Sequence, residues 1–195
     1  MMSLLAEAIA RIKELLDEAK ASDLREPTAM SVATVDELGR PAVRTVLLKH
    51  LDESGLVFFT NRKSRKGMHL QAVPYAAVCI YFQQAHQQVQ VDGKIVMVSD
   101  EEADGYWQTR PRASQIGAWA SRQSEVLDTR QQLYDRVSQY EKEFAGTDVP
   151  RPDHWGGYRV VPERIEFWSG HPDRLNQREQ YSLGSGEWNK TQLYP

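Results

Sequence analysis

The sequence predicts one α+β domain, mainly β, in which antiparallel strands form a barrel or a strongly curled sheet with peripheral helices. Apolar runs of strand length recur along the chain, whereas helical periodicity is confined to the N-terminus and the middle. Strand and helix patterns do not alternate regularly, and no GxGxxG or GxxxxGKS/T motif occurs, which argues against a doubly wound nucleotide-binding fold. The 195 residues suffice for one domain with a substantial core.

Four segments are predicted to be helical. Residues 3–20 carry apolar side chains at helical spacing, which places them in one stripe. A basic loop at residues 61–71 is expected to run into a short helix. Ser99 is a favourable N-cap, and the glutamates after it favour the first turn of a helix that ends near Thr109. A longer helix is predicted at residues 124–144, where several apolar residues share one face.

The other apolar runs are predicted to be strands because they are rich in β-branched and aromatic residues. They are residues 29–35, 41–50, 55–60, 75–82, 87–98, 158–168 and 187–193. The first three should form an antiparallel meander, with a turn at Gly39 between the first and the second. Gly93 should bend the fifth strand, and Pro162 should interrupt the sixth.

Composition narrows the function classes. The formal net charge of -3 argues against general nucleic-acid binding. No apolar run approaches the ~20 residues that cross a bilayer, and the N-terminus lacks a signal-peptide pattern, so the expected location is cytoplasmic. The single cysteine, Cys79, lies in the apolar run AAVCIYF and is interpreted as a core residue. The histidines lack ligand spacing and no CxxC or HExxH pattern occurs, so no metal site is expected.

The segment RPRASQIGAWASRQS, residues 110–124, carries the strongest functional signal. Arg110 and Arg112 offer forked donors that suit phosphate oxygens, and Ser114 adds a hydroxyl. The segment is therefore interpreted as a site for an anionic, phosphorylated ligand. The alternative is an arginine-rich helix start with a buried Trp119.

Three further segments combine cations with polar or aromatic residues: RTVLLK (44–49), NRKSRK (61–66) and WSGHPDRLNQR (168–178). Each also has a structural interpretation, respectively charges that flank a core strand, a solvated basic loop, and a surface hairpin with a packed tryptophan. Arg44 and Lys49 are five apart, so a regular strand would point them to opposite faces unless a bulge intervenes. Together the segments suggest more than one phosphate, and the lack of a nucleophile–base arrangement favours a cofactor that performs the chemistry.

In this order, these motifs resemble the pyridoxine/pyridoxamine 5′-phosphate oxidases. RTVLLK, FFTNRKSRK, QVQVDGK, YWQTRPRASQIGAWASRQS, HWGGYRV and IEFWSG all match, and the similarity covers residues 26–195, after an N-terminal helix at 1–22. The resemblance implies a single-domain, FMN-binding split β-barrel with peripheral helices. It also implies a homodimer whose two active sites lie at the subunit interface and draw residues from both chains.

The resemblance assigns two overlapping sets of residues. Those expected to bind FMN are Arg44, Thr45, Val46, Leu47, Lys49, Phe59, Thr60, Arg65, Lys66, Gln88, Gln123, Ser124, Trp168 and Arg178. Those expected to hold the substrate are Lys49, Tyr106, Arg110, Ser114, Arg174 and Asn176. Arg174 would lie over the substrate ring opposite the flavin, and Asn176 stands beside it at the second catalytic position. Arg112 has no ligand in this assignment.

The implied reaction moves a hydride equivalent from C4′ of pyridoxamine or pyridoxine 5′-phosphate to the flavin. Dioxygen then reoxidises the flavin, which yields pyridoxal 5′-phosphate and hydrogen peroxide. The family usually has His-Asp where this chain has Asn176-Gln177, so a proton-carrying side chain and a negative charge are both missing. Two alternatives therefore stand, a related flavin oxidase for another ring system and a low-turnover carrier of FMN or pyridoxal phosphate. Many members have a longer N-terminal tail over the site, so looser closure is expected here.

Overall fold

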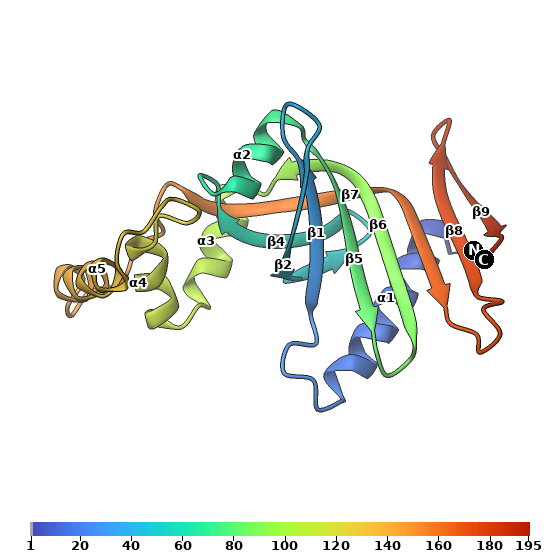
Figure 1. Cartoon of the computed structure of the whole chain (residues 1–195), viewed down its shortest axis with the longest axis horizontal. Helices are drawn as coiled ribbons and strands as arrows, with labels where there is room; N and C mark the ends of the chain where they lie inside the picture. Colours follow the sequence, from blue (N-terminus) through green and yellow to red (C-terminus); the bar gives the residue numbers. More distant parts are fainter. Residues whose placement is uncertain (1) are drawn as a thin grey trace.

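The structure is a computed structural model that describes residues 2–195 (Figure 1). In this range the helices are α1 (Leu4–Lys20), α2 (Arg65–Ala72), α3 (Asp100–Gln108), α4 (Arg112–Ala120) and α5 (Arg130–Glu143). The strands are β1 (Ala29–Val35), β2 (Pro41–Leu47), β3 (His50–Asp52), β4 (Gly55–Asn61), β5 (Tyr75–Phe82), β6 (Gln87–Met97), β7 (Trp155–Ser169), β8 (Gln177–Gly184) and β9 (Glu187–Leu193). The predicted mainly β architecture with peripheral helices is confirmed.

The strands form one antiparallel sheet in the order β2-β1-β5-β6-β7-β4-β3, and β8 pairs with both β7 and β9. The predicted meander of the first three strands is wrong. β1 and β2 do form a hairpin, but β4 pairs with β3 and β7. The predicted strand 41–50 also ends early. The N–H of Leu48 still donates to the carbonyl of Thr28 at 2.9 Å, in the register of β1 with β2, but the N–H of Lys49 donates to Val57 of β4 instead. Alternating hydrophobicity marked these strands but carried no information about their partners.

The long strand β7 shapes the sheet because the edge that faces away from β6 changes its partner strand along the length of β7. Its first half pairs with β4 as far as Val160, and its second half pairs with β8 from Arg164 onward. At the junction the β6–β7 pairing shifts register between Asp92 and Gly93, because Asp92 is opposite Arg164 and Gly93 is opposite Pro162. Glu163 of β7 is therefore the extra residue, and the irregularity falls at Gly93, where the sequence predicted a bend. Pro162 lies beside this irregularity, where a missing N–H is tolerated. The strand is therefore distorted next to the proline but continues through it, rather than being interrupted as the sequence predicted.

Gly93 is required at this junction. A Cβ built on it would lie 1.9 Å from the backbone oxygen of Val161. We expect Gly93→Ala to lower the free energy of unfolding, measured by urea denaturation, by about 1–3 kcal/mol because the backbone must shift. The control is Gly105→Ala in α3, where nothing lies within 4 Å and a gain of up to about 1 kcal/mol is expected. Unchanged stability of Gly93→Ala would contradict the close backbone approach.

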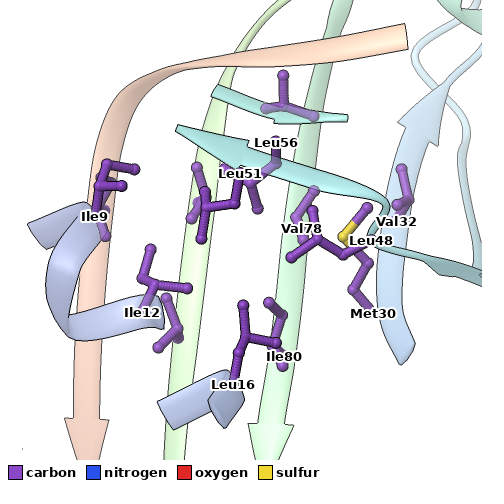
Figure 2. Packing of buried hydrophobic residues seen from close by; sticks show 14 of the residues in the cluster. Ile9, Ile12, Leu16, Met30, Val32, Leu48, Leu51, Leu56, Val78 and Ile80 are labelled. Carbon is purple, nitrogen blue, oxygen red and sulfur yellow. The ribbon is translucent and has the colours of Figure 1, made fainter. Parts of the chain in front are cut away.

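Two hydrophobic clusters fill the molecule. The larger one lies between α1 and the inner face of the sheet, and Figure 2 shows Ile12 and Leu16 on the side of α1 that faces the strands. The smaller one centres on Trp107 and Trp155, and Phe59 and Tyr106 pack against it. Cys79 belongs to neither cluster and is partly exposed on the outer side of β5, so its interpretation as a core residue is wrong.

The helical predictions hold for the chain up to α3 better than for residues 112–144. The N-terminal helix and the Ser99-capped helix α3 are confirmed. The helix predicted at 124–144 begins only at Arg130, because Ser124 has a left-handed backbone and Thr129 provides the N-cap. Val126 is consequently 94% exposed in the preceding loop. Strand β8 was not predicted. Helix α4 begins at Arg112, as in the alternative interpretation of the 110–124 segment, but Trp119 is only partly buried.

Candidate functional site

A cavity of about 760 Å³ lies where β2, the end of β4, α2, α3 and the segment around α4 meet. Its size falls in the range of sites for small organic ligands. Fourteen of the residues predicted for ligand binding line it, namely Arg44, Thr45, Val46, Leu47, Lys49, Phe59, Thr60, Arg65, Lys66, Tyr106, Arg110, Ser114, Gln123 and Ser124. Five of the lining residues are cationic and none is acidic, so the cavity is built for an anion.

Arg44 and Lys49 line the same cavity although they are five residues apart. The buried Leu48 still pairs with Thr28 in the register of β1 with β2, whereas the N–H of the next residue, Lys49, donates to the carbonyl of Val57 on β4 at 2.8 Å. This change of partner strand rotates the backbone. The sequence interpretation required a bulge for such convergence, and the structure achieves it by breaking the strand.

One end of the cavity gathers Arg44, Arg65 and Lys66. Lys66 is buried, and its Nζ donates to Thr60 Oγ1 at 2.9 Å and to Gln123 Oε1 at 3.3 Å. Burial and the nearby Arg44 lower the pKa of Lys66 to about 8. Burial, followed by the charge of Arg65, also lowers the pKa of Arg44. Within residues 2–195 no ion pair neutralises these three cations, so an anionic ligand would relieve their repulsion.

The other end gathers Lys49, Tyr106, Arg110 and Ser114 around an aromatic stack. Phe59 stacks on Tyr106 at 4.3 Å between ring centroids, and also on Trp155 at 5.3 Å. The Arg110 guanidinium lies 4.8 Å from the centroid of Trp155, a cation–π distance. Its Nη2 donates to the carbonyl of Ser114, but its Nε is buried with no partner among the described residues. Because Arg110 lines the cavity, its charge is available to an anionic ligand such as a phosphate.

Arg112 has a different role from Arg110. Its two terminal nitrogens donate to the backbone carbonyls of Thr147 at 2.8 Å and Phe144 at 2.6 Å. It does not line the cavity. Arg112 therefore ties α4 to the loop after α5, and the RPRAS segment contributes one ligand-facing arginine and one structural arginine.

Five predicted site residues do not line this cavity: Gln88, Trp168, Arg174, Asn176 and Arg178. Gln88 on β6 is directly opposite Trp168 on β7, which is opposite Arg178 on β8. Figure 1 shows β8 at the far end of the molecule from α3 and α4. Within one chain these residues form a separate group, so their roles stay predictions.

The group at the start of β8 has its own contacts. Arg178 forms a two-point ion pair with the buried Glu166, with N–O distances of 2.8 and 3.1 Å. Asn176 Oδ1 accepts from the backbone N–H of His171 at 3.0 Å, which closes the turn before β8. Arg174, the residue predicted to lie over the substrate, has a left-handed backbone with φ at 61°. It lies within the turn that Asn176 closes. Asn176 thus stabilises the loop that carries Arg174.

Sequence reasoning missed several residues that support the cavity, among them Thr34, His69 and Trp155. Thr34 and His69 are 2% and 7% exposed and hydrogen-bond to each other. The available signal was a threonine in the inward series of Met30, Val32 and Thr34, where an apolar residue is expected. Within residues 2–195 there is no cluster of three metal-ligating side chains, and no helix is long and apolar enough to span a membrane.

Comparison with known proteins gives consistent matches along the chain. Residues 15–143 match the family model for pyridoxamine 5′-phosphate oxidase, and residues 155–195 match the C-terminal dimerisation region of pyridoxine 5′-phosphate oxidase. The pyridoxine/pyridoxamine 5′-phosphate oxidase of Myxococcus xanthus strain DK1622 is 50% identical over 97% of this chain and 92% of its own length. The enzyme of the same name from Synechocystis is 47% identical over 92% of this chain and 84% of its own length.

Solved structures confirm the fold. PhzG from Burkholderia lata 383, in complex with tetrahydrophenazine-1-carboxylic acid, superposes with a TM-score of 0.91 at 32% identity, covering 97% of this chain and 93% of that one. A pyridoxamine 5′-phosphate oxidase-related, FMN-binding protein from Nostoc punctiforme has a TM-score of 0.76 at 20% identity, covering 95% and 96% of the two chains. At 20% identity, the similarity to the Nostoc protein shows a shared fold only.

Proposed function

Because this chain belongs to the pyridoxine/pyridoxamine 5′-phosphate oxidase family, we propose that it oxidises pyridoxamine and pyridoxine 5′-phosphates to pyridoxal 5′-phosphate with FMN. Dioxygen is the acceptor in this proposal, and hydrogen peroxide the second product. The observation that carries the proposal is a cavity with cations at both ends and no carboxylate in its lining. Two cationic ends suit two phosphate-bearing ligands, a cofactor and a substrate.

The residues at the α2 end fit the phosphate and ribityl chain of FMN. Lys66 and Arg44 supply charge, Thr60 supplies a hydroxyl, and Arg65 lies in the first turn of α2, where free N–H groups also favour anions. Gln123 and Ser124 also line the cavity and would contact the flavin. FMN, when bound, supplies the hydride acceptor, a capacity that no side chain of the cavity has.

The residues at the Arg110 end fit the substrate phosphate. Arg110 and Lys49 supply charge, and Tyr106 and Ser114 add two hydroxyls. The chain's contribution to the reaction is then orientation, since the phosphate contacts fix the substrate's C4′ relative to the cofactor. The Arg110 guanidinium is held against Trp155, which limits its movement while the ligand is bound.

A second copy of the chain would complete the site. Four of the five predicted residues that do not line the cavity lie in the segment that matches the dimerisation region: Trp168, Arg174, Asn176 and Arg178. In a homodimer these residues, with Gln88, would reach the partner's cavity rather than their own. A related flavin oxidase acting on another ring is the second candidate, favoured by Asn176-Gln177 and by the likeness to PhzG.

The experiment is an aerobic assay on the purified protein. We expect a flavin absorption spectrum and equal amounts of pyridoxal 5′-phosphate and peroxide from pyridoxamine 5′-phosphate, with far weaker activity on unphosphorylated pyridoxamine. A colourless protein that cannot be reconstituted with FMN would contradict every flavin-based function. A flavoprotein that retains pyridoxal phosphate without turnover would indicate a carrier, and turnover only of an unphosphorylated, carboxylated ring would favour the second candidate.

A further inference from the structure

A buried polar pair lies behind the cationic end of the cavity. Thr34 points inward from β1, and His69 points to it from α2, with 3.1 Å between Thr34 Oγ1 and His69 Nδ1. Both side chains are more than nine-tenths buried, and neither lines the cavity. Burial of polar groups is unfavourable unless hydrogen bonds compensate it, so the partners of this pair define its role.

The pair continues to Arg44. Nη1 of Arg44 donates to Thr34 Oγ1 at 2.7 Å and to the carbonyl of Val32 at 3.1 Å. Since arginine can only donate, the Thr34 oxygen accepts, and its hydroxyl proton is available for Nδ1 of His69. The matching tautomer of His69 carries its proton on Nε2. The Thr34 hydroxyl is thus engaged on both sides and fixes one nitrogen of Arg44.

Electrostatics alone would not hold Arg44 in this place. It has no carboxylate partner among the described residues, and burial together with the charge of Arg65 lowers its pKa. The neutral oxygens of Thr34 and Val32 are what hold its guanidinium. His69 lies one turn after Arg65 and Lys66 on α2, so its bond to Thr34 also fixes that helix against β1.

We propose that Thr34 and His69 are positioning residues that set Arg44 of β2 and the first turn of α2 in one arrangement. In that arrangement Arg44, Arg65 and Lys66 converge on a single phosphate group of the bound ligand. This inference rests on the proposed function, in which that group is the FMN phosphate. It adds two residues behind the site that contact no ligand and act through Arg44.

The test measures binding to the apoprotein by quenching of flavin fluorescence. Thr34→Val keeps the shape of the side chain and removes its hydroxyl, so the Kd for FMN should rise about tenfold to a hundredfold, as expected for a lost hydrogen bond to a charged group. The Kd for riboflavin, which lacks the phosphate, should change less than about twofold on the same reasoning. Thr34→Ser should stay near the wild type. Ser31→Ala removes an exposed hydroxyl from the same strand and is the matched control.

His69 is tested in parallel. His69→Asn places an amide oxygen near the position of Nδ1 and should retain most of the discrimination between FMN and riboflavin, whereas His69→Leu should lose it. If Thr34→Val does not fold, the positioning role of the pair is tested by the ratio of FMN to riboflavin affinity in His69→Asn and His69→Leu. Equal ratios in those two variants would overturn the role of His69.

A double-mutant cycle separates positioning from general packing. In an Arg44→Ala background, Thr34→Val should change the Kd for FMN less than about twofold, because the residue it acts through is gone. An unchanged effect in that background, or an equal loss for riboflavin, would overturn the proposal. A wild-type protein that binds riboflavin as tightly as FMN would instead refute the phosphate site itself, which distinguishes the two failures.

Discussion

Arg110→Ala is expected to raise the KM for pyridoxamine 5′-phosphate at least about thirtyfold, because it removes a half-buried charge from a phosphate contact. Bound FMN should remain, since the residues proposed for its phosphate are those around Lys66, whereas Arg110 donates to Ser114 and lies against Trp155. The KM for unphosphorylated pyridoxamine should hardly change. Steady-state kinetics with both substrates, together with the ratio of flavin to protein absorbance, provide the measurement.

Arg112→Ala is the matched control for this prediction. It removes the same charge two residues away, but Arg112 donates only to backbone carbonyls of the 144–147 segment. Its KM for the phosphorylated substrate should stay within about twofold of the wild type, apart from any loss of stability seen by thermal unfolding. Loss of FMN from Arg110→Ala, or equal effects on both substrates, would show that the substrate phosphate lies elsewhere.

FMN binding is expected to weaken above pH 8 through Lys66. Burial and Arg44 lower the pKa of Lys66 to about 8 in the free protein, and a bound phosphate dianion would favour the charged ammonium. Binding therefore takes up a proton above pH 8, and the Kd for FMN should rise about fivefold from pH 8 to 9 and approach a tenfold rise per pH unit above that. Riboflavin titrated over the same range should show little change.

The variant Lys66→Arg tests whether deprotonation of Lys66 weakens FMN binding, because a guanidinium stays charged between pH 8 and 9.5. Its Kd for FMN should be nearly independent of pH, whatever its absolute value. The stability of the apoprotein should change with pH in the opposite direction to its affinity for FMN. Unfolded Lys66 binds its proton more tightly than the folded residue, so the apoprotein should gain stability between pH 8 and 10. A wild-type FMN Kd that is flat across pH 8 to 9.5 would contradict a role for Lys66 at the phosphate.

Local patterns predicted the elements better than their connections. The strand at 75–82 was predicted with its bounds, because alternation and β-branched residues coincide there. The helix at 124–144 was predicted too long, because the left-handed backbone at Ser124 leaves no mark in hydrophobic spacing. Strand β8 was missed because its sequence, QREQYSLG, is mostly polar and it is held mainly by pairing with β7 and β9.

For the site, the sequence alone determined the chemistry. Cations next to hydroxyls in RTVLLK, NRKSRK and RPRAS indicated phosphate, and the resemblance supplied the residues that line the cavity. Only the tertiary structure decided which of these cations converge. Arg44 and Lys49 line one cavity because the chain changes partner strand after Leu48, and Arg110 separates from Arg112 because their guanidinium groups find different partners. Donor type is a property of each residue, whereas the direction of a side chain depends on hydrogen bonds to segments far away in the sequence.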